Sequence, residues 1–140
     1  MMENFLEIEY INDNPSKIRV KASNGYYAGF CETYINRNWF RTFSEKLKRF
    51  PHEVSEVVFE SEPGLGEKAT CYIKVYLKDK LGHVNLCVAL KYGVHSYEAI
   101  GESKFIIDCE LSQLDSFSKS LDKALNSDHC FVKLIGSEYI

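Results

Sequence analysis

Cysteine and histidine are the side chains of this 140-residue chain that could most readily perform catalysis. A cysteine nucleophile needs a thiolate and a base within reach. Residues 71–90 predict a hairpin that brings His83 near Cys71 or Cys87. This pairing is the basis for one interpretation, a small enzyme or ligand-binding domain with a pocket near His83. A structural role for the thiols is favoured, because a cysteine within a strand usually acts as a small buried hydrophobe.

The other cysteines, histidines and glycines form no recognised site. The five cysteines are an odd number without a C-x-x-C pair, and the histidines lack zinc-binding spacing. The loop Pro63-Gly-Leu-Gly66 lacks the Lys-Ser/Thr of a phosphate-binding loop. We therefore predict no metal, no cofactor and no disulfide framework. The cysteines are Cys31, Cys71, Cys87, Cys109 and Cys130, and the histidines are His52, His83, His95 and His129.

Two pairs of carboxylates also deserve a chemical interpretation. Glu60 and Glu62 lie two residues apart on or beside a predicted strand, as do Asp108 and Glu110, so each pair shares one face. Acid–base catalysis by two carboxylates usually takes them from separate elements that flank a cleft. We interpret both pairs as solvated charge and predict no catalytic residue.

An acidic run between residues 53 and 67 is the surface feature that indicates binding. Its glutamates have Lys68 as the only nearby cation, so they repel one another, and a basic partner would relieve that repulsion. The alternative is a solubilising loop. The predicted contact residues in this run are Glu53, Glu56, Glu60, Glu62 and Glu67.

The chain is organised around the hairpin from Cys71 to Leu90 that follows this run. In its first arm the apolar residues at 71, 73, 75 and 77 share the face toward a core, and Tyr72 and Tyr76 lie on the outward face. Exposed tyrosines are frequent anchors of protein interfaces, so both join the predicted contact residues. A homodimer that buries these tyrosines is the alternative.

Two segments have apolar residues at helical spacing instead of alternation. The first stripe is Trp39, Phe40, Phe43, Leu47 and Phe50, and the second is Leu114, Phe117, Leu121 and Leu125. Ser112 is the predicted N-cap of the second helix. Further strands are predicted over residues 5–11, 18–22, 26–35, 54–59, 97–111 and 130–135. Within the third of these, Ala28-Gly29 predicts a bulge or a close approach by another group.

These elements predict a single α+β domain spanning residues 1–140. A mostly antiparallel sheet of about six or seven strands would be covered on one face by the two amphipathic helices. The halves also echo each other, because Phe40-x-x-Phe43-x-x-x-Leu47 has the spacing of Leu114-x-x-Phe117-x-x-x-Leu121. This echo is the basis for the hypothesis of a duplicated strand-strand-strand-helix unit.

Composition excludes several functional classes. The formal net charge is −3, whereas a nucleic-acid binder normally has a basic stripe that displaces counterions from phosphates. The first residues lack the charged and apolar regions of a signal peptide, and no apolar run approaches the roughly 18 residues of a membrane-spanning helix. We expect a cytoplasmic protein with neither a nucleic-acid nor a membrane partner.

Several stretches resemble the WapI-type immunity proteins, small bacterial proteins that protect a cell from the toxic C-terminal domain of a wall-associated protein. The resemblance rests on Leu81-Gly82-His83-Val84 followed by alternation to Leu90, on the aromatic strand and first helix, and on Gln113-Leu114-x-x-Phe117. It covers most of residues 26–125. It implies a non-enzymatic protein that neutralises a protein toxin domain by contact, as a monomer or a homodimer.

Overall fold

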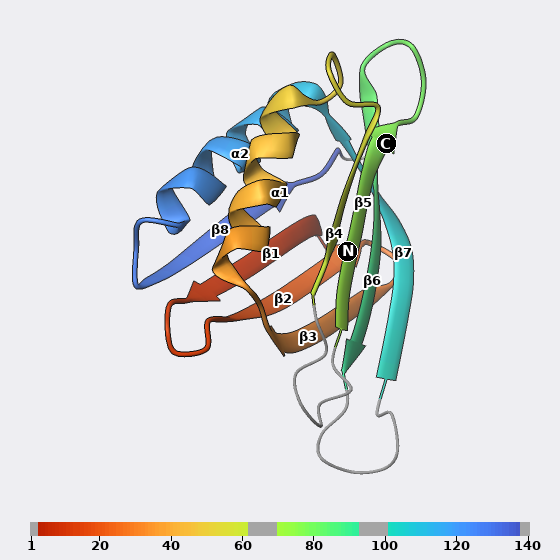
Figure 1. The fold of residues 1–140 in the computed structure, drawn as a ribbon. Helices are drawn as coiled ribbons and strands as arrows, with labels where there is room; N and C mark the ends of the chain where they lie inside the picture. Colours follow the sequence, from red (N-terminus) through yellow and green to blue (C-terminus); the bar gives the residue numbers. More distant parts are fainter. Residues whose placement is uncertain (1–2, 62–69, 93–100, 138–140) are drawn as a thin grey trace.

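The structure is a computed structural model that describes residues 3–61, 70–92 and 101–137 (Figure 1). Sheet A has the strand order β3-β2-β1-β8, and sheet B has the order β4-β5-β6-β7. Every neighbouring pair in both sheets is antiparallel. Sheet A contains β1 (Asn4–Ile11), β2 (Lys17–Asn24), β3 (Ala28–Tyr34) and β8 (His129–Ile135). Sheet B contains β4 (Glu56–Glu60), β5 (Thr70–Leu77), β6 (His83–Tyr92) and β7 (Gly101–Glu110).

The helices α1 (Arg37–Arg49) and α2 (Leu111–Ala124) complete the described fold. They lie beside each other on the inner side of both sheets, with α1 against β4 and α2 against β8 (Figure 1). The predicted α+β class is confirmed. The predicted single sheet of six or seven strands is wrong, because the strands divide into two four-stranded sheets. Alternation tells which side of a strand is buried, but it does not tell which strands are neighbours.

The two halves of the chain have the same order of elements. Each half has three sequential antiparallel strands, then a helix, then a strand that pairs in the opposite sheet. Thus β4 follows α1 and joins β5, while β8 follows α2 and joins β1. This topology contains the strand-strand-strand-helix unit that the sequence predicts twice. Descent of the two halves from one duplicated unit stays a prediction.

The two sheets close against each other where β3 meets β7. The Oγ atom of Ser103 donates a hydrogen bond of 2.7 Å to the carbonyl oxygen of Ala28. Nearby, the side-chain amide of Asn24 donates a hydrogen bond of 3.2 Å to the carbonyl oxygen of Ile106. These contacts occupy backbone groups at the edges of both sheets that would otherwise be open to another strand.

Gly29 permits this close approach, which confirms the expectation for Ala28-Gly29. A Cβ atom added at Gly29 would lie 2.9 Å from Cβ of Ser103. We expect Gly29→Ala to lower the free energy of unfolding by about 1–3 kcal/mol, as overpacking does. Chemical denaturation would measure the loss. The matched control is Gly101→Ala, whose added Cβ meets no atom within 4 Å, and equal losses in the two variants would contradict this explanation.

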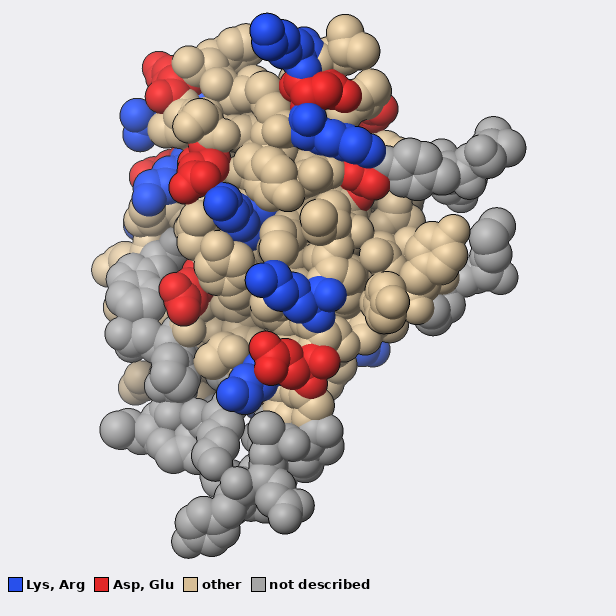
Figure 2. Space-filling model, turned by 90° about the vertical axis from the view of Figure 1, so that its right-hand side faces the viewer, with Lys and Arg blue, Asp and Glu red and all other residues tan. Residues whose placement is uncertain are grey.

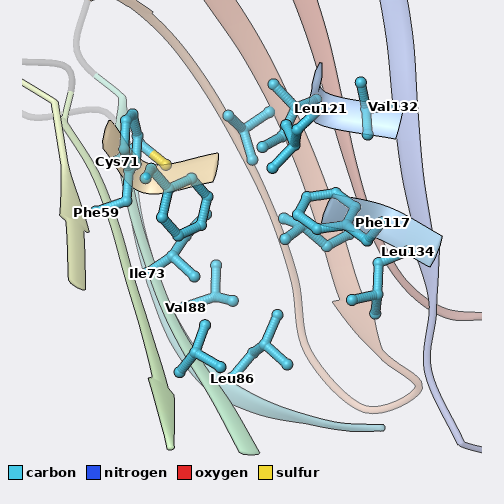
Figure 3. Packing of buried hydrophobic residues seen from close by; sticks show 14 of the residues in the cluster. Phe59, Cys71, Ile73, Leu86, Val88, Phe117, Leu121, Val132 and Leu134 are labelled. Atoms are coloured by element: carbon cyan, nitrogen blue, oxygen red, sulfur yellow. The ribbon is translucent and has the colours of Figure 1, made fainter. Parts of the chain in front are cut away.

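The core lies between the sheets and the helices as one contiguous cluster of buried residues. Side chains of Ile73, Leu86 and Val88 from sheet B point toward Phe117 of α2 and Leu134 of β8 (Figure 3). The described members of both predicted helical stripes are buried, which confirms the stripes: Phe40, Phe43, Leu47, Phe50, Leu114, Phe117, Leu121 and Leu125. The side chain of Trp39 lies outside the described part of the structure.

Polar side chains mark where the helices begin. Asn36 caps α1, because its Oδ1 atom accepts a 2.9 Å hydrogen bond from the backbone N–H of Asn38. The predicted cap of α2 at Ser112 is wrong, since the N-cap is Glu110. The side chain of Gln113 accepts a 2.7 Å hydrogen bond from the backbone N–H of Glu110. This reciprocal contact is part of a capping box, which satisfies donors at the helix start.

Candidate partner-binding face

The candidate site is the outer face of sheet B, which is the face opposite the core. Four of the predicted contact residues meet there, because Glu56 pairs directly with Tyr76 and Glu60 pairs directly with Tyr72 across β4 and β5. Both tyrosines are half-buried, and both glutamates are exposed. No described helix or strand covers this face (Figure 1).

Between these two pairs, a row of side chains crosses the sheet, and it has apolar residues at both ends. The register places Val58 opposite Lys74, Lys74 opposite Cys87, and Cys87 opposite Ile106. Val58 is 40% exposed and Ile106 is 42% exposed, so apolar surface remains open at both ends of the row. Figure 2 looks onto this side of the molecule, where acidic and basic side chains are interspersed on a surface of mostly other residues. The face therefore combines apolar contact area with polar groups around it.

Charges on this face are mixed rather than uniformly acidic. The Nζ atom of Lys74 lies 3.4 Å from a carboxylate oxygen of Glu56 and 5.6 Å from the centre of the Tyr76 ring. Lys74 lies between the two tyrosines in sequence and shares their outward face, but it is not among the predicted contact residues. Glu60 forms no ion pair within 4 Å among the residues that the structure describes. Among the described residues, Glu60 is thus the one of these two glutamates that is not engaged with a lysine.

The other predicted contact residues do not extend this face. Glu53 follows α1, and its carboxylate pairs with Arg49 at 2.9 Å, one turn earlier. Glu62 and Glu67 lie outside the described residues. The structure therefore assembles Glu56, Glu60 and the two tyrosines, and it leaves Glu53 in a local ion pair of small energetic value.

No protein-family model, curated protein or solved structure matches this chain.

His83 lies at one end of the same sheet, beside the turn that joins β5 and β6. Its Nδ1 atom is 2.6 Å from Oδ2 of Asp79, and its Nε2 atom is 3.6 Å from Oε1 of Glu110. Asp79 also accepts a 2.8 Å hydrogen bond from the backbone N–H of Leu81. The hydrogen bond to Asp79 raises the pKa of His83 and lowers the pKa of the Asp79 carboxyl. This arrangement stabilises a turn.

The thiols considered with His83 are in different surroundings. Cys71 is completely buried and faces the core, whereas His83 is on the outer face, and burial raises the pKa of the Cys71 thiol well above its ordinary value. Burial likewise raises the pKa of Cys109 to about 12. A raised pKa keeps a thiol protonated and unreactive. Cys87 shares the outer face with His83, since both occupy odd positions of β6.

Two cavities are found among the described residues. A shallow cavity of about 610 Å³ is lined mainly by β1, β2 and β3, including Phe5, Lys21 and Phe30. A smaller one of about 260 Å³ shares Phe30 and includes Tyr92 and Ser103. Neither is lined by His83. These two cavities therefore do not provide the pocket near His83 that this interpretation requires.

Within the described residues, no group of three or more histidine, cysteine, aspartate or glutamate side chains is arranged to hold a metal ion. Neither α1 nor α2 is long and apolar enough to cross a membrane.

The pair of Asp79 and His83 has a testable dependence on pH. It stabilises the fold where Asp79 is ionised and His83 is protonated, so its contribution is complete below the ordinary histidine pKa of about 6.5 while Asp79 stays charged. The contribution is lost as the pH rises through the raised pKa of His83. We expect Asp79→Asn, which keeps an acceptor for Leu81, to lower the pKa of His83 in an NMR titration. An unchanged titration would refute the pairing.

Proposed function

We propose that this protein is a non-enzymatic inhibitor of the immunity type, which neutralises a protein toxin domain by direct contact through the outer face of sheet B. The observation that carries the proposal is the register of β4 and β5, which sets Glu56 beside Tyr76 and Glu60 beside Tyr72 on an uncovered sheet face. The resemblance to WapI-type immunity proteins supports the same function.

The tyrosines supply the contact energy in this proposal. Each has a large ring held on a rigid strand, so little side-chain entropy is lost when a partner covers it. The row from Val58 to Ile106 lies between them and adds apolar area. Charged side chains around such a centre exclude water and define the orientation of the partner.

The glutamates act mainly on encounter and orientation. A basic partner would be attracted to Glu60 and would compete with Lys74 for Glu56, whose ion pair is exposed and therefore weak. Attraction of this kind increases the association rate and is screened by salt. Because Lys74 reduces the local negative charge, we expect a moderate dependence on salt rather than a steep one.

The experiment that identifies the partner is a pull-down with tagged protein. Lysate and secreted fractions of the cells that make the protein would be tested at low and high salt, and the captured proteins identified by mass spectrometry. We expect recovery of a polymorphic-toxin fragment, with less at high salt. Recovery of the tagged protein's own untagged copies alone would contradict the proposed function.

A further inference from the structure

In each sheet, one of the two edge strands lies away from the junction where β3 meets β7. These strands are β4 in sheet B and β8 in sheet A, which occupy equivalent places in the two halves. No described strand pairs with the second edge of either. An edge strand of this kind is a template for another chain unless its side chains prevent pairing.

The hydrogen bonds of β8 show which of its backbone groups are open. The backbone N–H of Gly136 donates to the carbonyl oxygen of Asn4 at 2.8 Å, and the register of β1 and β8 places these two residues directly opposite each other, so theirs is a hydrogen-bonded position of the ladder. Hydrogen-bonded and non-hydrogen-bonded pairs alternate along an antiparallel ladder. Even-numbered residues of β8 therefore bond to β1. The backbone N–H and C=O groups of His129, Phe131, Lys133 and Ile135 point to the open edge.

The side chains of these same odd-numbered residues are unusually apolar for an open edge. Phe131 is 58% exposed and Ile135 is 61% exposed. Lys133 lies between them, with its Nζ atom 3.3 Å from Glu3 and 5.0 Å from the centre of the Phe5 ring. His129 contacts Glu9 and the ring of Phe131.

We propose that β8 pairs antiparallel with β8 of a second copy of this chain, around a two-fold axis at Val132. In this register Phe131 faces Lys133 of the second copy, and His129 faces its Ile135. Each pair exchanges two backbone hydrogen bonds, because all of these residues have their N–H and C=O groups on the open edge. The two copies of sheet A form one continuous sheet, with Val132 of both copies on the inner side.

The charges of β8 select this register over its neighbours. Centring the axis on Lys133 would set that lysine against its own copy, whereas centring it on Phe131 would set Lys133 opposite His129 instead of a phenylalanine ring. Like charges directly opposite each other destabilise a strand pair. The axis at Val132 avoids both and places each lysine beside a phenylalanine ring, which is a favourable cation–π arrangement.

The equivalent edge of β4 presents different side chains to such a pairing. The N–H of Ser61 donates to the carbonyl oxygen of Cys71 at 2.9 Å, so by the same alternation the open edge belongs to Glu56, Val58 and Glu60. A symmetric pair centred on Val58 would place Glu56 opposite Glu60 of the other copy. A pair centred on Val57 or Phe59, the equivalent of the register proposed for β8, would place a glutamate opposite Val58 of the other copy. None of these open-edge residues is a cation or an aromatic ring, so β4 lacks the pairing of Lys133 with Phe131. We therefore assign self-association to β8, which leaves the outer face of sheet B free for a different partner.

Two substitutions at one position test the register. Phe131→Lys places a lysine opposite Lys133 of the second copy, whereas Phe131→Glu places a glutamate there, and both variants lose the same ring. Sedimentation velocity over a concentration series reaching the millimolar range would measure dimer formation. We expect wild type to dimerise, Phe131→Lys to raise the dissociation constant at least tenfold, and Phe131→Glu to dimerise at least tenfold more tightly than Phe131→Lys.

Far-UV circular dichroism would show that both variants keep the fold, which the exposure of Phe131 predicts. Backbone amides of Phe131 and Lys133 should exchange hydrogen more slowly in concentrated than in dilute wild-type samples. Wild type that stays monomeric throughout the series would overturn the proposal. Equal weakening by the two substitutions would also overturn it, because the effect would then come from the lost ring instead of the charge opposite.

Discussion

Replacing Phe40 with alanine is expected to lower the free energy of unfolding by about 3–5 kcal/mol. The Phe40 side chain is completely buried. Its ring stacks on Tyr10 with 5.5 Å between the centroids and meets the edge of Phe59 at 5.8 Å. These rings come from α1, β1 and β4, so Phe40 connects α1 with both sheets. A cavity at this point removes contacts that no other described element replaces.

Chemical denaturation of Phe40→Ala and wild type would measure this loss. Phe131→Ala is the matched control, because Phe131 is 58% exposed and its loss should change monomer stability by no more than about 0.5 kcal/mol. Both proteins should be compared at low concentration, where association through β8 does not contribute. A loss below about 1 kcal/mol for Phe40→Ala would contradict the described packing, since removal of a fully buried phenylalanine ring costs more.

Reversing the charges of Glu56 and Glu60 together is expected to weaken toxin binding about 10- to 100-fold, because like charges would then face a basic partner. The substitutions Glu56→Lys and Glu60→Lys are on exposed positions. Loss of the ion pair between Glu56 and Lys74 should reduce stability only slightly, as surface pairs contribute about 0–1 kcal/mol. Surface plasmon resonance with the captured fragment would measure the dissociation constant.

Two further pairs of substitutions separate position from total charge. Glu45→Lys with Asp115→Lys changes the net charge by the same amount at exposed positions of α1 and α2, and we expect a loss below about threefold. Glu56→Gln with Glu60→Gln should fall between wild type and the reversal. Equal losses for the reversals in sheet B and in the helices would mean that only net charge matters, and the glutamates would then have no role as contacts.

Local structure was largely predictable from sequence because burial follows the period of each element. Alternation over residues 84–90 correctly placed Val84, Leu86, Val88 and Leu90 in the core. The stripe from Phe40 to Phe50 likewise indicated α1. Asn24-Gly25 is a residue pair that tolerates positive φ in a tight turn, and Gly25 has a φ of 92° between β2 and β3.

Long-range pairing was not predictable from these patterns. The pairing of β8 with β1 joins the two ends of the described chain, and nothing in the alternation of either strand specifies the other. The cap of α2 was missed for a different reason. Ser112 is a good N-cap by residue type, but Glu110 with Gln113 forms the alternative capping signal three residues apart.

For the candidate site, alternation correctly put Tyr72 and Tyr76 on the outer face, but only the register of β4 could show that Glu56 and Glu60 are their direct neighbours. The sequence also indicated that the contact surface is an acidic run between residues 53 and 67. Lys74 changes this picture, since it lies opposite Val58 in register and pairs with Glu56. Alternation along β5 already indicated this lysine, because it places Lys74 on the outward face between the two tyrosines.

The most direct measurement of the proposed contact face is backbone hydrogen exchange of the protein with and without the captured toxin fragment. The proposal predicts slower exchange in β4 and β5, including the amides of Glu56, Val58 and Glu60 at the edge of sheet B. Exchange in sheet A should change little at a fixed protein concentration. Protection confined to sheet A or to α1 and α2, with β4 and β5 unchanged, would contradict binding through the outer face of sheet B.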